Sequence, residues 1–324
     1  MRVETFDATD RVRWLALRER DVTASVAGAL LGVHDYQTPY GLWALKSGRV
    51  QEDPDETAPM RRGRLLEPVA LQMLAEDRPG WTIRPGRQYF RAPDLRIGAT
   101  PDAFATRPDR QGEGIVQIKT TTDQVFRRKW VDPEGDPDEP VLPLWIAVQA
   151  NVEARLTGAA WAAVGVLIVG HGLDLRVIDV PIHDGIWARL KAEVSRFWAM
   201  VEAGEEPEID PQRDGAAIAA VYSETAERVV DLGHHNDLPE LLIERAALRT
   251  REEDGREAKE RRQAIDAVLI HRLQGASRGA LRDGTTISAA AQHRPGHYVP
   301  ASTFRSVRVR GPLADPRPEI PDRF

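Results

Sequence analysis

The chain of 324 residues contains no cysteine. Disulfide bonds, thiolate zinc sites, cysteine nucleophiles and cysteine-bound iron–sulfur clusters are therefore excluded. The sequence also lacks any apolar run near the roughly 20 residues that a membrane-spanning helix needs. Charged residues occur throughout the first thirty positions, which is not a signal-peptide pattern. We therefore expect no membrane segment and a cytoplasmic location.

An excess of positive charge is absent as well. The chain has 44 Lys and Arg against 50 Asp and Glu, a net charge of −6. This balance argues against binding nucleic acid through a surface that is basic everywhere. It is compatible with an acidic centre beside one basic groove. Three basic clusters are candidates for such a groove, with a solvated surface as the alternative for each: Arg61, Arg62 and Arg64; Arg84, Arg87 and Arg91; and Arg127, Arg128 and Lys129.

Secondary-structure patterns alternate along the first two thirds of the chain, and no internal repeat is apparent. Apolar spacing with cap signals predicts helices over 9–18, 23–31, 39–47, 59–77, 143–157 and 184–203. Strand patterns cover 81–91, 95–99, 114–119, 161–169 and 173–180, and the acidic, proline-rich run 131–140 predicts a loop. This order predicts an α/β fold with one central mixed sheet flanked by helices.

The pattern changes after Gly204. Residues 238–274 mix Glu and Arg at spacings that favour surface ion pairs along one helix or a helical pair. Short strands are suggested at 285–290 and 303–310. We therefore predict a domain at 1–205 and a mostly helical accessory region at 206–324, in which no motif indicates a chemical role.

The predicted domain at 1–205 contains a series of polar residues on successive helices and strands. In the strand GIVQIKTT at 114–121, Gln117 and Lys119 share a face, and Asp102 precedes Gln117 by 15 positions. This spacing lets two neighbouring strands present both side chains on one side of a hairpin. Glu67 and Gln149 lie on the predicted helices before and after these strands. Phosphodiester hydrolysis requires acidic oxygen ligands for Mg²⁺ and a cation beside the attacking water, so a carboxylate would be expected where Gln117 stands.

The segments around these residues resemble a known family. GATPDAF at 98–104, followed by IVQIKTT at 115–121, resembles the signature of the PD-(D/E)XK nuclease superfamily. Three further segments resemble the YqaJ-like viral recombinase family, which includes phage lambda exonuclease: LRERDVTASVAGALLG at 17–32, MRRGRLLEP at 60–68 and AVQANVEARLTG at 147–158. The resemblance covers roughly residues 10–205 and implies a restriction-endonuclease-like core.

The resemblance also implies residue roles. Asp102, Gln117 and the carbonyl of Ile118 would bind metal, and Glu67 would do so directly or through water. Lys119 would orient and help deprotonate the attacking water, and Gln149 would steady substrate or water. Arg18 and Ser25 match positions that receive the 5′-phosphate of DNA, a contact that suits the fork of Arg and a hydroxyl near a helix N-terminus.

Each role has a simpler alternative. These are a surface position for Arg18, an N-cap for Ser25, an ion pair with Arg64 for Glu67, an edge-strand charge for Lys119 and an ordinary buried amide for Gln149. His234 and His235 near Asp231 are compatible with a metal, but an exposed loop is the stronger interpretation.

Three functions are compatible with the sequence. The first is a Mg²⁺-dependent 5′→3′ exonuclease, with Mn²⁺ as a possible substitute. It would act on double-stranded DNA ends and leave 3′ single strands for an annealing protein in phage or prophage recombination. The resemblance further implies a homotrimer in the cytosol of a bacterial host. The second is a DNA-end-binding protein without catalysis, which Gln117 alone supports. The third, a RecB-type or CRISPR adaptation nuclease, is disfavoured because many of those hold a cluster through four cysteines.

Overall fold

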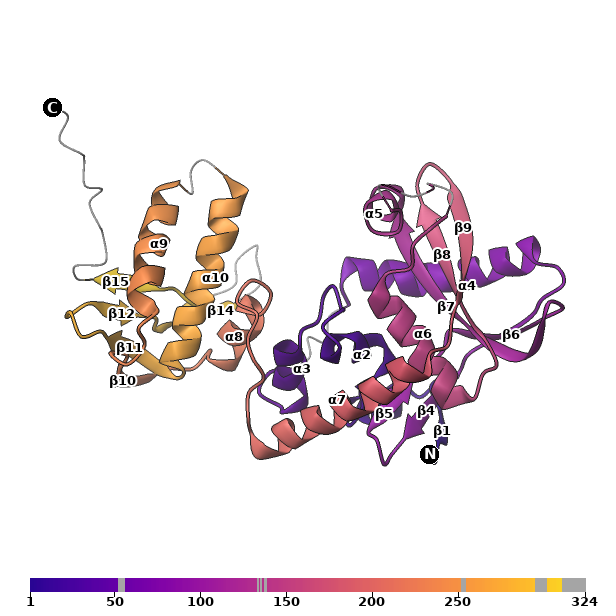
Figure 1. The fold of residues 1–324 in the computed structure, drawn as a ribbon, viewed down its shortest axis with the longest axis horizontal. Coiled ribbons are helices and arrows are strands. Elements are labelled where there is room, and N and C mark those ends of the chain that lie inside the picture. The colour runs from indigo at the N-terminus through magenta and orange to yellow at the C-terminus, as the bar shows by residue number, and fades with distance from the viewer. Residues whose placement is uncertain are drawn as a thin grey trace. The chain divides into compact units, whose positions relative to one another are not determined.

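The computed structural model describes residues 1–51, 56–132, 134, 136, 139–251, 255–294 and 302–310 (Figure 1). The chain forms two compact units. The first comprises Met1–Leu42 and Glu52–Glu206, and the second comprises Trp43–Gln51 and Pro207–Phe324. Part of the predicted loop 131–140 lies outside the described residues. No helix in the described ranges is both long and apolar enough to span a bilayer.

A five-stranded sheet forms the centre of the first unit. Its order is β3 (Thr82–Pro85), β6 (Ala103–Arg107), β7 (Arg110–Thr122), β8 (Ala162–Val169) and β9 (Leu173–Val180). β7 and β8 run parallel, whereas the other neighbours are antiparallel. The sheet is therefore mixed, and the predicted α/β class is confirmed.

Helices cover both faces of this sheet. Ile115, Val164 and Val166 pack on one face with α6 (Leu144–Thr157). Val116, Ile118 and Leu167 pack on the other face with α4 (Ala58–Asp77). Because β8 is buried on both faces, its sequence AAVGVLIV is almost continuously apolar. β7, which also lies between the two helices, is held in a fixed register at the site described below.

The remaining helices of the first unit begin and end close to the predicted positions. They are α1 (Arg11–Glu19), α2 (Ala24–Leu30), α3 (Pro39–Lys46), whose last residues belong to the second unit, and α7 (Asp184–Ala203). Asp10 caps α1 by accepting from the backbone N–H of Arg13, and α7 ends at Gly204 with φ 70°. A further helix, α5 (Asp123–Lys129), follows β7 directly. The sequence patterns did not predict α5.

The single strand predicted over 81–91 is wrong. The segment forms β3 in the central sheet and β4 (Gln88–Ala92) in a second sheet of order β1-β4-β5-β2. The other members of that sheet are β1 (Glu4–Asp7), β5 (Ile97–Ala99) and β2 (Val22–Thr23). The chain changes sheets at Gly86, whose N–H donates to the carbonyl of Asp102 at 2.8 Å. A Cβ atom at Gly86 would lie 1.9 Å from the carbonyl oxygen of Pro101, so the close approach requires glycine.

The second unit combines helices with a small sheet. α9 (Leu238–Arg251) and α10 (Arg256–Leu273) occupy the range predicted as one helix or a helical pair, and α8 (Gly215–Val221) precedes them. The sheet has the order β10 (Ala226–Asp231), β11 (Ala276–Ala280), β12 (Thr286–Ser288) and β15 (Arg308–Arg310). β13 (Ala291–Arg294) and β14 (Ser302–Arg305) form a separate pair. β10 and β11 were not predicted.

Candidate active site

Asp102 and Gln117 meet because β6 and β7 are antiparallel neighbours. Ala103 pairs with Val116, so the residues next to them on each strand lie side by side. The amide Nε2 of Gln117 donates to Oδ2 of Asp102, and the backbone N–H of Ile118 donates to the same oxygen at 2.7 Å. These two donors fix the Asp102 carboxyl at the point where β7 faces α6.

Lys119, two residues after Gln117 on β7, connects the site to α6. Its Nζ donates to Oε1 of Gln149 at 2.8 Å, and Nε2 of Gln149 donates to Oε1 of Glu153 at 2.8 Å. Gln149 and Glu153 stand one turn apart on α6 and are buried, with 4% and 1% of their surface exposed. Glu153 therefore determines which end of the Gln149 amide faces Lys119. Gln149 is both a buried amide and a direct partner of the lysine.

Glu67 approaches the same group from α4. It is half-buried, and its carboxylate is close enough to Lys119 and Asp102 to affect their protonation. The alternative ion pair with Arg64 is wrong, because Arg64 instead binds Glu56 through two hydrogen bonds of 2.8 Å. Glu67 thus faces the lysine of β7 and does not lie in a surface ion pair with Arg64.

Burial dominates the electrostatics of this group. Burial, together with charge repulsion from Glu67, raises the pKa of Asp102 to about 7. Burial, together with repulsion from Asp102, raises the pKa of Glu153 to about 8. Burial also raises the pKa of Glu67, which Lys119 partly offsets. The pKa of Lys119 is lowered by loss of solvent, against the stabilising charges of the carboxylates around it. Carboxyls and an amine with pKa values moved toward neutrality are typical of a functional site.

Two buried oxygen atoms of this group, Oε1 of Gln117 and Oε2 of Glu153, have no hydrogen-bond partner among the residues that the structure describes. Buried acceptors without a partner are rare in proteins, because such a group has lost its hydrogen bonds to water and gained none from the protein. With Asp102 and Glu67, Oε1 of Gln117 offers a set of oxygen donors, the ligand type that Mg²⁺ prefers. In the described part of the chain, no three acidic or histidine side chains are arranged to hold a metal ion. The three side chains therefore offer a divalent cation two carboxylates and one neutral amide oxygen, which is one negative charge fewer than three carboxylates would supply.

Sequence reasoning missed two contributors to this site. Glu153 lies within the quoted segment AVQANVEARLTG, four residues after Gln149, and this spacing on one helix face is the signal that sequence reasoning left unused. Gly86 supports the turn that presents Asp102. It carried no comparable signal, because its importance arises from a contact with residues 15 and more positions away.

Arg18 and Ser25 are on α1 and α2. The guanidinium of Arg18 lies 4.4 Å from the centre of the Trp14 ring. Thr23 occupies the N-cap position of α2, so the N-cap alternative for Ser25 is wrong, and Ser25 falls in the first turn with its Oγ 3.1 Å from Oγ1 of Thr23. Both side chains are half-buried.

Most members of the three basic clusters are already paired. The ion pairs are Arg64 with Glu56, Arg84 with Glu113, Arg91 with Asp21, Arg127 with Asp123 and Lys129 with Asp35. Arg62 donates to the carbonyl of Thr120 at 3.3 Å. Asp21 is fully buried, so Arg91 neutralises an interior carboxylate. These pairs favour structural and surface roles for the five members over a continuous basic groove.

The rings of His234 and His235 lie 4.0 Å apart between their centres and are tilted by 40°, and Asp231 accepts from the backbone N–H of Gly233 at 2.7 Å. They belong to no group of three metal-binding side chains among the described residues.

Comparison with known proteins shows which family the part of the chain around the site is similar to. Residues 13–158 match the YqaJ-like viral recombinase domain. The uncharacterized protein YqaJ of Bacillus subtilis is 27% identical over 217 residues, which make up 65% of this chain and 62% of that protein. An alkaline exonuclease from Laribacter hongkongensis is similar in structure, with 21% identity, 60% of this chain and 93% of that chain covered, and a TM-score of 0.44. A phage-related exonuclease from Haemophilus somnus is also similar in structure, with 12% identity, 56% of this chain and 94% of that chain covered, and a TM-score of 0.41.

The family match encloses the whole polar group on β7, α4 and α6. It also includes Arg18 and Ser25. Residues 13–158 of this chain are therefore similar to the YqaJ-like viral recombinase domain.

Proposed function

We propose that the chain is a Mg²⁺-dependent deoxyribonuclease that digests double-stranded DNA from its 5′ ends. The observation that carries this proposal is the arrangement of Asp102, Gln117 and Lys119 at the junction of β6 and β7. A carboxyl fixed by two donors lies next to an unpaired amide oxygen and a desolvated lysine. The match of residues 13–158 to the YqaJ-like viral recombinase domain supports nuclease chemistry over other hydrolytic reactions.

Asp102, Glu67, Oε1 of Gln117 and the Ile118 carbonyl would hold the cation. A bound Mg²⁺ would polarise the phosphoryl oxygen and lower the pKa of a bound water. The Gln117 amide now directs its NH₂ toward Asp102. Rotation of this amide would present its oxygen beside Asp102 to the same cation.

Lys119 would orient the attacking water and receive its proton. Its lowered pKa favours the neutral amine, which is the form that accepts a proton. Gln149 holds Nζ of Lys119 from the side of α6, and Glu153 fixes the Gln149 amide. A chain of three side chains thus positions the lysine relative to Asp102.

The direction of digestion and the product follow from the proposed contact at Arg18 and Ser25. A site that receives a terminal 5′-phosphate would release mononucleotides from one strand and leave a 3′ overhang. We further propose that the active form is a homotrimer, that an annealing protein uses the overhang in phage-type recombination, and that the enzyme works in the bacterial cytosol.

A second function is a DNA-end-binding protein with weak or no catalysis. Gln117 favours it, because this side chain supplies a neutral oxygen where an acid would bind Mg²⁺ more tightly. The two functions share a fold and a substrate, and they differ in turnover.

Digestion of a linear duplex distinguishes them. The substrate carries a 5′-phosphate, with a different fluorescent label near each end of one strand, and is incubated with Mg²⁺, with Mn²⁺ or with EDTA. The exonuclease proposal expects metal-dependent loss of the label near the 5′ end before the label near the 3′ end, and no digestion of a closed circular duplex. Stable binding of the duplex without any product in either metal would favour the end-binding protein.

A further inference from the structure

One face of the four-stranded sheet in the second unit carries arginine and hydroxyl side chains in register. Arg278 on β11 pairs with Ser288 on β12, which pairs in turn with Arg308 on β15. Thr286 on β12 pairs with Arg310 in the next row of the same face. Residues that pair across strands, and residues two apart on a strand, point to the same side of a sheet. On β10, Val229 pairs with Arg278, and Arg228 beside it, at a register irregularity of the strand, lines the same hollow as Arg278, Arg308 and Arg310. We call Arg278, Arg308 and Arg310, with Thr286, Ser288 and the adjoining Arg228, the arginine face.

The opposite side of this sheet is the packed side. Ile287, between Thr286 and Ser288, is fully buried. A Cβ atom at Gly279 would lie 2.5 Å from Leu232 and 2.8 Å from Leu273 at the end of α10. The four arginines of the arginine face, by contrast, are exposed. The hydrophobic core therefore lies behind the sheet, and the arginines are presented to solvent by a rigid support.

These arginines are not neutralised by neighbouring acids. Arg228, Arg278, Arg308 and Arg310 form no ion pair in the described ranges, whereas Arg245 and Arg262 of the same unit share the carboxylate of Asp266. Four exposed guanidinium groups around one hollow repel one another. Such an arrangement is stabilised by a ligand with several negative charges.

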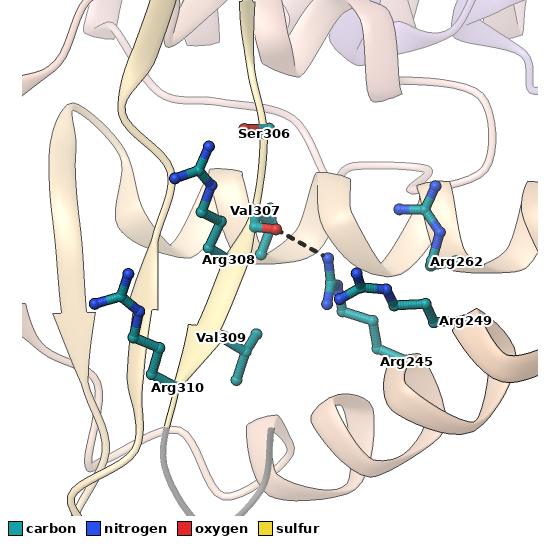
Figure 2. Close-up of a pocket in the computed structure, with 8 residues that line it drawn as sticks. All are labelled: Arg245, Arg249, Arg262, Ser306, Val307, Arg308, Val309 and Arg310. Atoms are coloured by element: carbon teal, nitrogen blue, oxygen red, sulfur yellow. Dashed lines mark hydrogen bonds between the residues drawn. The ribbon is translucent and has the colours of Figure 1, made fainter. Parts of the chain in front are cut away.

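Two hollows lie along this surface and meet at β15. The first, of about 520 Å³, is lined by Arg308 and Arg310 from β15 and by arginines of the two long helices. Figure 2 shows Arg308 and Arg310 on one side of this hollow and Arg245, Arg249 and Arg262 on the other. The second hollow, of about 760 Å³, extends over the arginine face, and Glu227 is the one acid among the described residues that line either hollow.

The lining also restricts the kind of polyanion. Among the described residues of both hollows none is aromatic, so the surface has no platform on which unpaired bases would stack. Arginine forks and hydroxyl groups are donors that suit phosphate oxygens. The combination favours the backbone of a duplex, whose phosphates are exposed while its bases remain stacked, over a single strand.

We propose that the arginine face binds the phosphate backbone of duplex DNA independently of base sequence. This would give the chain a DNA-binding surface in its second unit, in addition to the site on β7. The choice of DNA rests on the proposed nuclease function, while the preference for a duplex polyphosphate rests on the surface itself.

The test is the salt dependence of duplex binding by the full chain. A labelled blunt 30-bp duplex is titrated in EDTA between 50 and 200 mM salt with the parent protein and with Arg308→Ala/Arg310→Ala. Each lost phosphate contact lowers the slope of log K against log salt by about 0.9. Two lost contacts lower it by about 1.8, so that over this fourfold range the affinity of the parent falls about 12-fold more than that of the variant.

Two further variants separate a binding face from dispersed charge. Lys259→Ala/Arg282→Ala removes the same charge from exposed positions of the second unit that line neither hollow, and it should leave the slope unchanged. Arg278→Ala alone, on a different strand, should lower the slope by about 0.9. Thermal melting of each variant establishes that the unit still folds.

Equal slopes for the parent and the β15 variant would overturn the proposal, and would make Arg308 and Arg310 charges that protect an edge strand from pairing. An equal effect of the control pair would overturn it too, since binding would then depend on net charge alone. A larger loss for a single strand than for the duplex would contradict the duplex assignment. Because no cleavage is needed, an inactive parent would count against the nuclease proposal without affecting this test.

Discussion

Replacing Gln117 by Glu tests how the site tolerates its neutral residue. In the structure Nε2 of Gln117 donates to Oδ2 of Asp102, and 4% of the Gln117 surface is exposed. Glutamate has the same shape but no donor, so without metal two carboxylates would face each other next to Glu67. A hydrogen bond to a charged group contributes about 1.5–3 kcal/mol. A loss of about 2 kcal/mol would lower the unfolding midpoint of a unit of this size by about 4–8 °C.

Mg²⁺ should reverse this loss, because a cation between the carboxylates replaces their repulsion by attraction. We expect Gln117→Glu to melt below the parent in EDTA and to gain more thermal stability from Mg²⁺ than the parent gains. We also expect at least a tenfold increase in initial nucleotide release across a Mg²⁺ titration, about 1.4 kcal/mol in the barrier or in metal occupancy. Gln111→Glu, an exposed change on the same strand, is the matched control. A variant that gains no more from Mg²⁺ than the parent and is no faster at any concentration would show that the site is built around a neutral ligand.

Three other changes test separate parts of the account. Since the pKa of Glu153 is raised from 4.5 to about 8, the stability that its protonated form contributes is fully present below about pH 4.5 and is lost as the pH rises through 8. The melting temperature in EDTA should therefore fall less steeply from pH 5 to pH 9 for Glu153→Gln than for the parent, and parallel curves would refute this. Gly86→Ala should lower cleavage at least about tenfold, because the added Cβ displaces the Pro101–Asp102 turn. Gly185→Ala, whose added Cβ would meet open space, is the control, and parent-like turnover of Gly86→Ala would contradict the prediction. Arg18→Ala should reduce digestion of 5′-phosphorylated ends far more than of 5′-hydroxyl ends, whereas an equal loss would indicate a packing role beside Trp14.

Local patterns predicted the elements with a regular apolar spacing. β8, β9 and α7 lie within a residue of their expected positions. β8 is buried on both faces and almost continuously apolar, β9 begins with alternating apolar and charged residues, and α7 has one apolar side. The strand over 81–91 failed because its break depends on a backbone contact between Gly86 and Pro101, which local apolar spacing does not reveal. β6 was missed because its sequence AFATR is short and only weakly strand-like.

The candidate site divides in a similar way. The spacing of Asp102, Gln117 and Lys119 along two strands was sufficient to predict that they would be neighbours, because hairpin geometry fixes their register. Glu153 was not singled out, since its significance lies in the orientation of Gln149 and in an oxygen left unpaired by burial. Both depend on how α6 packs against β7, which no local pattern describes.

The most direct test of the central claim compares cleavage with end binding in Asp102→Ala and Lys119→Ala. Both residues are assigned to metal and water, so their removal should affect the transition state more than affinity for the duplex. The account predicts that the Mg²⁺-dependent digestion shown by the parent is abolished in both variants, while each still folds and binds a 5′-phosphorylated duplex end with near-parent affinity. Turnover close to that of the parent in either variant would contradict the assignment of this site.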